Sequence, residues 1–169
     1  CSLFDFPEIG DIEETGTTLL ENSLLKARTV FNITGIPTIA DDTGLEVDFL
    51  DGAPGVYSAR YAGNNVSYQD NVNKLLIELD GVPREKRKAK FRTVVTYIDK
   101  NDELWTEGHI DGIISENIIG DGGFGYDPIF FVPHIGKTFA ELSSAEKNKI
   151  SHRGIALQKL RNILINVLK

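Results

Sequence analysis

The sequence predicts an α/β fold in which a mixed, partly antiparallel sheet is flanked by helices. Three segments carry apolar residues at helical intervals, and others are rich in β-branched residues or alternate as strands do. Turn signals separate these segments, and no repeats or low-complexity tracts interrupt them. A length of 169 residues with 41% hydrophobic side chains suits one sizeable core. We therefore expect a single domain over residues 1–169.

The composition argues against two classes of partner. Twenty-five acidic residues against 18 basic ones give a formal charge of −7, whereas proteins that bind nucleic acid or anionic membranes usually carry a basic surface. No apolar run approaches the roughly 18 residues of a membrane span, and no signal-peptide pattern opens the sequence. The single cysteine, Cys1, excludes an internal disulfide and fits a reducing compartment. We expect neither a nucleic acid nor a membrane as partner.

The first expected helix follows an acidic, loop-like lead-in over residues 1–16. Thr18 and Glu21 have the spacing of a capping box, and apolar residues recur after Thr18 at helical intervals. Asn22 and Lys26 lie one turn apart on a neighbouring face, so both are candidates to face a cleft. The alternative for Lys26 is an ordinary solvated side chain.

An apolar strand is expected over residues 35–40, followed directly by two adjacent carboxylates, Asp41 and Asp42. Thr43 and Gly44 then predict a tight turn. Acids at the carboxyl end of a buried strand lie where open α/β sheets bind ligands, and neighbouring acids repel each other unless a cation is present. Carboxylates are also the ligands that Mg²⁺ requires. An Asx turn followed by a surface loop is the alternative.

The middle of the chain predicts a helix and several strands. The helix is expected over residues 71–79. The six basic side chains within residues 84–92 suit a solvated turn, with phosphate binding as the alternative. The expected strands cover residues 91–98, a hairpin return over 103–108, a further strand pair over 108–119 with a bulge at Gly112, and an apolar strand over 129–132.

Residues 120–128, with the sequence GDGGFGYDP, form a segment that can approach a ligand closely, because glycine has no side chain. Phe124 and Tyr126 flank Gly125 and offer stacking surfaces, while Asp127 offers a hydrogen-bond acceptor. The alternative is a glycine-rich hairpin whose two aromatic side chains belong to the core.

Two helices are expected near the end of the chain. Ser143 and Glu146 form a capping box for a short helix, and Ser151 caps a final amphipathic helix. A helix start favours anions or carbonyl oxygens through its free N–H groups and its dipole. The side chains that gather there are Lys147, His152 and Arg153. With the acids and aromatics upstream they suit a nucleotide phosphate ester with a bound metal, although a plain first helical turn is the alternative.

Four long motifs carry a family resemblance: TGTTLLENSLLKA, IADDTGLEVDFLDGAPGVYSARYAG, GGFGYDPIFFVP and KTFAELSSAEKNKISHRGIAL. In this order and spacing they resemble the inosine triphosphate pyrophosphatase family, the XTP/dITP diphosphatases, over almost the whole chain. The resemblance implies two lobes with a nucleotide cleft between them, and a cytoplasmic homodimer that uses Mg²⁺. It also implies hydrolysis of the purine nucleoside triphosphates ITP, dITP and XTP to the monophosphate and pyrophosphate, which cleanses the nucleotide pool.

The resemblance also implies roles for residues at matching positions. Asp42 would be the general base and a metal ligand, Glu14 the second metal ligand, and Lys26 a phosphate contact. The other nucleotide contacts would be Thr43, Phe124, Gly125, Tyr126, Asp127, Lys147, His152 and Arg153. Thr43 replaces the family's commoner serine and keeps the hydroxyl. The family's first strand and its S/T-G-N-x-x-K phosphate loop have no counterpart in this sequence, so we expect an unpaired sheet edge or gap, lower stability than that of a complete relative, and almost no activity.

Three other functions remain open on the sequence. Asp42-Thr43-Gly44 is also the triplet of aspartic proteases, although one copy would need a dimer partner to supply the second aspartate. A non-catalytic purine nucleotide-binding module would keep the cleft without turnover. An RNA binder would use the basic side chains within residues 84–92, against the acidic charge of the whole chain.

Overall fold

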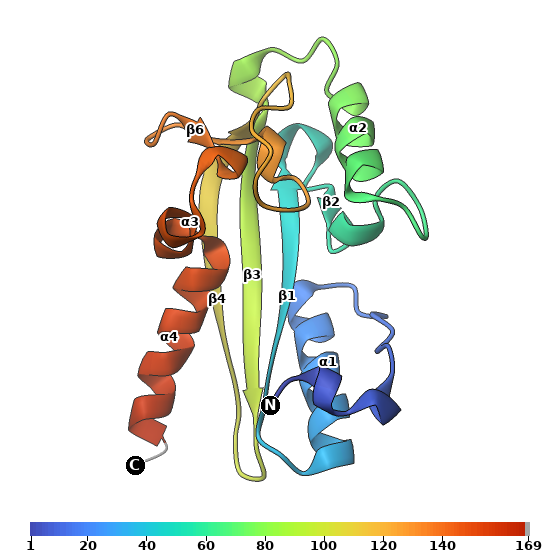
Figure 1. Cartoon of the computed structure of the whole chain (residues 1–169), viewed down its shortest axis with the longest axis vertical. Helices are drawn as coiled ribbons and strands as arrows, with labels where there is room; N and C mark the ends of the chain where they lie inside the picture. The colour runs from blue at the N-terminus through green and yellow to red at the C-terminus, as the bar shows by residue number, and fades with distance from the viewer. Residues whose placement is uncertain (168–169) are drawn as a thin grey trace.

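The computed structural model describes residues 1–167, which form a six-stranded sheet flanked by helices (Figure 1). The strands lie in the order β2-β1-β3-β4-β5-β6, with bounds Thr38–Val47 (β1), Pro54–Gly55 (β2), Lys88–Ile98 (β3), Glu103–Ile114 (β4), Phe130–Val132 (β5) and Lys137–Thr138 (β6). The helices are Leu19–Thr34 (α1), Tyr68–Glu78 (α2), Ser144–Ile150 (α3) and His152–Val167 (α4). The predicted α/β class is confirmed. All neighbouring strands are antiparallel, so the sheet is not mixed over the residues described.

The three long strands β1, β3 and β4 carry a helix on each face. On one face, the Ser23 hydroxyl of α1 lies 2.6 Å from the Thr96 hydroxyl of β3. On the other face, Val95 of β3 packs with Ala156 and Leu160 of α4. Side chains alternate along a strand, and the register of β1 with β3 pairs even-numbered residues with even-numbered ones. Even-numbered residues of both strands therefore point toward α1, and odd-numbered residues point toward α4.

Capping boxes start three of the four helices. The predicted pair Thr18 and Glu21 caps α1, and the Glu21 N–H donates to the Thr18 hydroxyl at 3.1 Å. Ser67 caps α2 in the same way, so this helix begins before the expected Asn71. Such a cap stabilises a helix by about 1 kcal/mol. The predicted cap of α3 at Ser143 is also confirmed.

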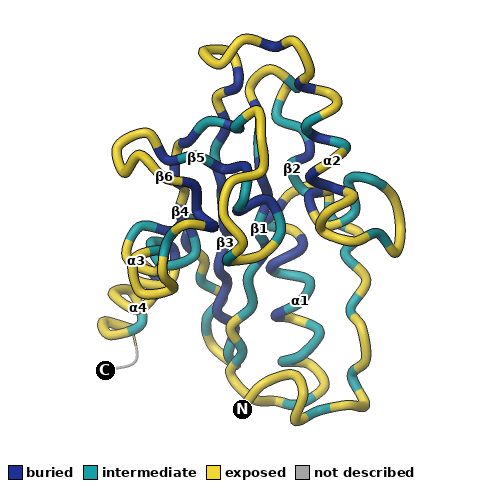
Figure 2. Tube along the Cα trace, turned by 45° about the horizontal axis from the view of Figure 1, so that its top comes forward, coloured by how far each residue is buried: buried dark blue, intermediate teal, exposed yellow. Residues whose placement is uncertain are grey.

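The larger hydrophobic core gathers aromatic and aliphatic side chains from the sheet, α2 and the segment after β5. Phe91 and Phe130 pack with their ring centroids 4.5 Å apart, and Phe139 stacks on Phe91. Leu45 and Leu75 are fully buried beside them. Burial is concentrated along the strands, while the outer loops are exposed (Figure 2). Each fully buried side chain of this kind contributes roughly 1.5–3 kcal/mol.

Strand β1 continues straight through the two adjacent acids. The tight turn predicted at Thr43 and Gly44 is therefore wrong, and the acids lie inside the strand rather than at its carboxyl end. The reason is tertiary pairing, because β1 pairs with β3 along its whole length and overrides the local turn preference. Gly44 serves close packing instead, since a Cβ there would lie 2.6 Å from the Gly55 carbonyl oxygen.

Strand β4 is one continuous strand that ends at Ile114, so the strand pair predicted over residues 108–119 is wrong. Its two glycines had suggested an interruption. Gly108 instead lets the backbone of α4 approach, and Gly112 leaves room for the Phe130 ring. The expected strand over residues 129–132 corresponds to β5.

The basic segment before β3 is only partly solvated. Arg87 is buried, and its guanidinium donates to the carbonyl oxygens of Leu79, Val82 and Ser115 at 2.6, 2.9 and 3.0 Å. The solvated turn expected here is therefore wrong at this position. Arg87 ties the end of α2 to the start of β3, and it is not available to a phosphate or to RNA.

The outer edge of β1 is largely open. β2 pairs with it only at Leu45 and Glu46, so residues 38–44 have no strand partner on that side within residues 1–167. This agrees with the unpaired edge expected from the sequence. None of the helices in the described part of the chain is both long and apolar enough to cross a membrane.

Candidate active site

A cleft of about 730 Å³ is lined by side chains of β1, α1, the glycine-rich segment 120–128 and the junction of α3 with α4. The predicted site residues that line it are Lys26, Asp42, Thr43, Phe124, Gly125, Tyr126, Asp127, Lys147, His152 and Arg153. Glu14 does not line the cleft but bonds to Lys26, which does. The fold thus brings together residues that lie far apart in the sequence.

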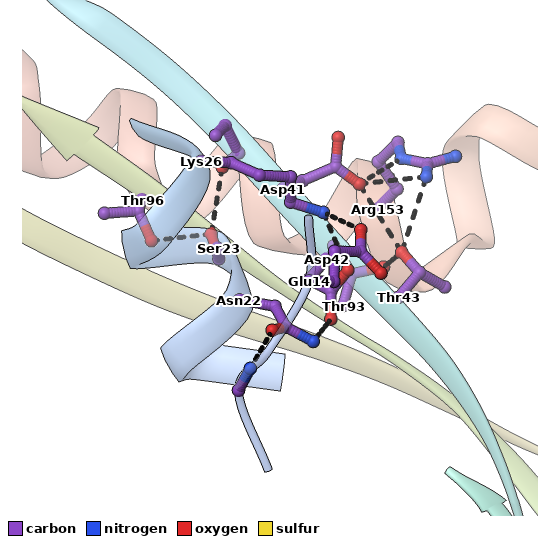
Figure 3. A network of polar contacts seen from close by, with 12 residues as sticks. Glu14, Asn22, Ser23, Lys26, Asp41, Asp42, Thr43, Thr93, Thr96 and Arg153 are labelled. Atoms are coloured by element: carbon purple, nitrogen blue, oxygen red, sulfur yellow. Dashed lines mark hydrogen bonds and ion pairs between the residues drawn. The ribbon is translucent and has the colours of Figure 1, made fainter. Parts of the chain in front are cut away.

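An acid–lysine cluster, Glu14, Lys26 and Asp42, forms where α1 faces β1 (Figure 3). The Lys26 ammonium donates to Glu14 Oε1 at 2.9 Å and to Asp42 Oδ1 at 2.7 Å. Asn22, one turn earlier on α1, donates to Asp42 Oδ2 at 3.4 Å and accepts from the Gly16 N–H at 2.7 Å. Lys26 lines the cleft as expected and is not an ordinary solvated side chain, whereas Asn22 is fully buried and contacts Asp42 without lining the cleft.

Burial and charge act in opposite directions on this cluster. Burial raises the pKa of Asp42, and the hydrogen bond and charge of Lys26 only partly offset that rise. Burial acts against the charged form of Lys26, but Asp42 and Glu14 outweigh it and raise the pKa of the ammonium. For Glu14, burial is outweighed by Lys26 and Arg60, so its pKa is lowered. The cluster therefore keeps a charged lysine beside a carboxylate of increased basicity.

Asp41 and Asp42 line the same cleft and are adjacent in sequence, but their side chains bind different partners. Asp42 points toward α1 and Lys26, whereas Asp41 points toward α4 and accepts from Arg153. The mutual repulsion expected of the two acids is therefore relieved by separate cationic partners. The central position of Asp42 in β1, bonded to a lysine, also argues against the aspartic protease alternative, which needs two facing aspartates.

The acid–lysine cluster suits a divalent cation of the Mg²⁺ type. Glu14 Oε1 and Asp42 Oδ1 both lie within hydrogen-bond distance of the Lys26 ammonium, so the two carboxylates are close to each other. Within residues 1–167 no group of three or more His, Cys, Asp or Glu side chains could hold a metal. Mg²⁺ characteristically takes one or two protein carboxylates and completes its shell with substrate phosphates and water. Two carboxylates at the edge of a cleft fit that pattern.

The glycine-rich segment presents Phe124 to the cleft. Gly123 and Gly125 adopt positive φ angles of 74° and 60°, which favour glycine. Asp127 accepts from the Phe124 N–H at 2.8 Å and pairs with Lys147, so both fix the segment. The Phe124 ring remains 54% exposed, with the Lys147 ammonium 4.7 Å from its centroid. Phe124 is therefore available for stacking.

Tyr126 does not offer a free stacking surface, contrary to expectation. Its side chain is buried in the larger core, and its hydroxyl donates to the Ser58 carbonyl oxygen at 2.9 Å. The alternation of aromatics with glycines does not distinguish a core aromatic from a ligand-facing one. Here Phe124 is the exposed member of the pair and Tyr126 is the anchor.

His152 is a buried, neutral side chain at the floor of the cleft. It is 5% exposed and stacks on Phe91 with ring centroids 4.7 Å apart. Burial, together with the charges of Arg153 and Lys147, lowers the pKa of His152 to about 3. Its buried Nδ1 has no hydrogen-bond partner among the described residues. At neutral pH this imidazole therefore has one N–H donor and one acceptor nitrogen.

Arg153, at the start of α4, also lines the cleft, and it contacts the face of β1 opposite to that of Asp42. Its Nε and Nη2 donate to Asp41 Oδ2 at 3.0 and 2.9 Å, and Nη2 lies 3.4 Å from the Thr43 hydroxyl (Figure 3). Thr43 in turn lies 2.6 Å from the Thr93 hydroxyl on β3. The sequence patterns had suggested Arg153 and Thr43, but not Thr93, because the cross-strand partner depends on the register.

Tyr68 of α2 is a further cleft residue that the sequence patterns did not reveal. It lines the cleft, and its ring centroid lies 6.3 Å from that of Phe124. No local signal marks Tyr68, because its contact with Phe124 depends on how α2 packs against the sheet.

A model of the Ham1 family matches residues 1–163. The chain is 53% identical over 159 residues to a dITP/XTP pyrophosphatase of Thermoanaerobacter sp. (strain X514), a match that covers 94% of this chain and 80% of the relative. It is 49% identical over 172 residues to a dITP/XTP pyrophosphatase of Listeria monocytogenes serovar 1/2a, covering 100% of this chain and 84% of that protein.

Solved structures agree with this fold. A HAM1 protein from Coxiella burnetii superposes with a TM-score of 0.88 at 42% identity, covering 94% of this chain and 82% of that chain. The Ham1 protein of Staphylococcus aureus gives a TM-score of 0.87 at 39% identity, covering 97% of this chain and 93% of that chain.

Proposed function

This chain belongs to the Ham1 family and, by its close similarity to relatives of that activity, is a dITP/XTP pyrophosphatase; we propose that the reaction takes place in the cleft described above. The substrates are purine nucleoside triphosphates, and the products are the nucleoside monophosphate and pyrophosphate. ITP, the ribose counterpart of dITP, is included among the substrates, because it carries the same base.

One observation carries this assignment of the site. The same cleft is lined by Lys26 and Asp42 of the acid–lysine cluster and by Phe124 and Arg153, an exposed aromatic ring and a cation. A nucleoside triphosphate needs both kinds of surface, one for its phosphates and one for its base. We therefore place the phosphates near Lys26 and the base near Phe124, with the cleft lying between the two lobes of the molecule.

Hydrolysis requires a water molecule to attack the α-phosphorus while the bond between that phosphorus and the bridging oxygen to the β-phosphate breaks. Asp42 accepts the proton of this water, and its raised pKa makes it a stronger base than an exposed aspartate. Lys26 stabilises the negative charge that develops on the departing pyrophosphate. General-base catalysis of this kind contributes roughly 10²–10⁴-fold to the rate.

We propose Mg²⁺ as the cofactor, with Glu14 and Asp42 as its ligands from this chain. The support is that these two carboxylates, whose oxygens are hard donors, lie close together beside the cleft, each bonded to the Lys26 ammonium. When bound, Mg²⁺ supplies positive charge that offsets the charge of the phosphoryl oxygens. Lys26 holds the two carboxylates together through its ammonium group.

The base end of the cleft favours an oxygen at position 6 of the purine. Phe124 stacks on the ring and contributes affinity without choosing among purines. Arg153 and the N–H of neutral His152 are donors, so they satisfy a 6-oxygen but face the amino group of adenine donor to donor. Adenine would leave these donors without an acceptor in the bound complex, and the cost of that mismatch discriminates strongly against it. Thr43, Asp127 and Lys147 support these contacts from the cleft wall.

The activity is tested by pyrophosphate release from a panel of dITP, XTP, dATP and dGTP, with Mg²⁺ and with EDTA. We expect pyrophosphate rather than orthophosphate, a clear preference for dITP and XTP, and loss of activity with EDTA. Nucleotide binding without pyrophosphate release would instead support the alternative, a non-catalytic purine nucleotide-binding module. Orthophosphate as the main product would place the attack at a different phosphorus.

We also propose a homodimeric assembly and a cytoplasmic location, which the family resemblance implies. We expect a homodimer, which sedimentation at micromolar concentration would show and a purely monomeric profile would contradict. We also expect the enzyme to act in the cytoplasm, where the nucleotide pool lies, and fractionation of cells that express the chain tests this.

A further inference from the structure

Arg153 is held by a carboxylate that neither the proposed base nor the proposed metal site uses. Asp41 points away from Asp42, toward α4, and accepts two hydrogen bonds from Arg153 through a single oxygen, Oδ2. The two side chains are about equally exposed, so the pair lies at the wall of the cleft rather than in the core. The pair lies beside the part of the cleft in which we place the purine base, so we considered what it contributes to base binding.

We propose that Asp41 is a positioning residue that fixes the guanidinium of Arg153 for recognition of the purine base. This inference rests on the proposed function of the cleft. It assigns the first acid of the Asp41-Asp42 pair to substrate selection, while the second serves the chemistry.

The geometry of the hydrogen bonds supports a positioning role. Asp41 engages Nε and Nη2, so one edge of the guanidinium is fixed and its plane is set. The remaining nitrogen, Nη1, makes no hydrogen bond with any side chain or backbone group of residues 1–167, and Arg153 lines the cleft. A rigid fork with one free donor edge is suited to reading an acceptor such as a 6-oxygen.

The strand beneath this pair is itself well fixed. Thr43 lies two residues after Asp41 on the same face of β1, and its hydroxyl lies 2.6 Å from that of Thr93 and 3.4 Å from Arg153 Nη2. Asp41 is paired with Val95 in the centre of the sheet. Arg153 therefore contacts Asp41 and Thr43 of β1, and Thr43 is in turn bonded to Thr93 of β3. Asp41 is the charged residue among these three.

A double-mutant cycle with Asp41→Asn and Arg153→Ala tests the proposal. Asp41→Asn keeps the size of the side chain and removes its charge. We expect it to reduce kcat/KM for dITP by about tenfold, mainly through KM, and to reduce the preference for dITP over dATP by a similar factor. If Asp41 acts through Arg153, the double variant should resemble Arg153→Ala, because the two effects are not additive. Asp111→Asn, an exposed acid on β4, is the matched control.

Two results would overturn the inference. An Asp41→Asn effect that adds fully to that of Arg153→Ala would show that Asp41 acts independently, and an unchanged dITP/dATP ratio would remove it from base recognition. Thermal unfolding of each variant shows whether the protein remains folded.

A measurement that needs no turnover separates this inference from the proposed activity. In ¹⁵N-labelled protein, we expect the Nε–H of Arg153 to exchange slowly with solvent, to exchange at least about tenfold faster in Asp41→Asn, and to shift when ITP is added. Slow exchange with an ITP shift but no pyrophosphate release would refute the activity and leave the positioning role standing. Equally fast exchange in wild type and Asp41→Asn would refute the positioning role even in an active enzyme.

Discussion

Asp41 and Asp42 are neighbours in the chain but belong to different parts of the site, because their side chains leave β1 on opposite faces. Asp42 is almost buried and bonds to Lys26, whereas Asp41 is partly exposed and bonds to Arg153. At the residue scale, therefore, the partner of each side chain decides its role, and adjacency in sequence does not.

Replacing Asp42 with Asn should remove activity without unfolding the protein. Asn cannot take a proton from water, so turnover should fall by roughly 10²–10⁴-fold. The pKa of Asp42 is raised, so its charged form is disfavoured in the folded state at neutral pH, and a neutral isostere should leave the unfolding temperature unchanged or slightly higher. Steady-state kinetics and thermal unfolding measure both. An Asp42→Asn enzyme with more than about a tenth of the wild-type rate would exclude Asp42 as the base.

The buried His152 should make the fold sensitive to mild acid. Its folded pKa, about 3, lies below the ordinary value of 6.5, so between these values the unfolded chain binds the extra proton. The contribution of His152 to the free energy of unfolding therefore reaches its maximum above about pH 6.5. As the pH drops toward 3, the free energy of unfolding falls by up to a few kcal/mol. Urea unfolding at pH 7 and pH 4.5 measures this. His152→Gln should flatten the difference, and an equal pH dependence in both proteins would contradict the explanation.

At the scale of elements, local signals predicted where helices begin, and tertiary pairing decided where strands end. The capping residues Thr18 and Ser143 marked the starts of α1 and α3 correctly, because a cap is satisfied within a few residues. Gly44 and Gly112 were misleading, because they suggested a turn and a bulge where the structure has uninterrupted strands. Glycine is required at these two positions because residues far away in the sequence pack against them, and a local sequence pattern does not include those residues.

Arg87 offers a test of such a distant tie between elements. Arg87→Met keeps the length of the side chain but removes the hydrogen bonds of the guanidinium to three backbone carbonyl groups, of which that of Leu79 keeps a second donor, the Val82 N–H at 3.0 Å. We expect a loss of about 3 kcal/mol in the free energy of unfolding. Chemical denaturation measures it, with Lys86→Met, an exposed neighbour, as the matched control. Equal free energies of unfolding for Arg87→Met and Lys86→Met would show that the hydrogen bonds of Arg87 do not stabilise the fold.

At the scale of the whole molecule, the sequence predicted the α/β class and most of the residues that meet in the cleft. Glu14, Lys26 and Asp42 were expected together, and they form one cluster in the structure. What could not be predicted was the division of the cleft between the two faces of β1, or the contact of Tyr68 with Phe124. Both depend on register and packing between segments that are far apart in sequence.

The open edge of β1 predicts a pattern of amide exchange across the sheet. In residues 38–44, about half of the backbone N–H groups should point away from β3 and exchange rapidly. Residues 93–97 of β3 lie between two strands and should exchange slowly. Hydrogen exchange followed by NMR measures both sets in one sample. Uniform protection of residues 38–44 would show that another segment or a second chain covers this edge.

Because β1 continues without interruption through Asp41 and Asp42, insertions and deletions within this strand have a predictable effect on the site. A one-residue insertion or deletion within residues 41–45 would rotate part of the strand by half a turn and exchange inward with outward side chains. The proton acceptor would then face Arg153, and the anchor of Arg153 would face Lys26. A substitution in this stretch affects one role at a time, whereas an insertion or deletion would exchange the roles of both acids at once, so gene variants of altered length are expected to place their changes in the loops outside it.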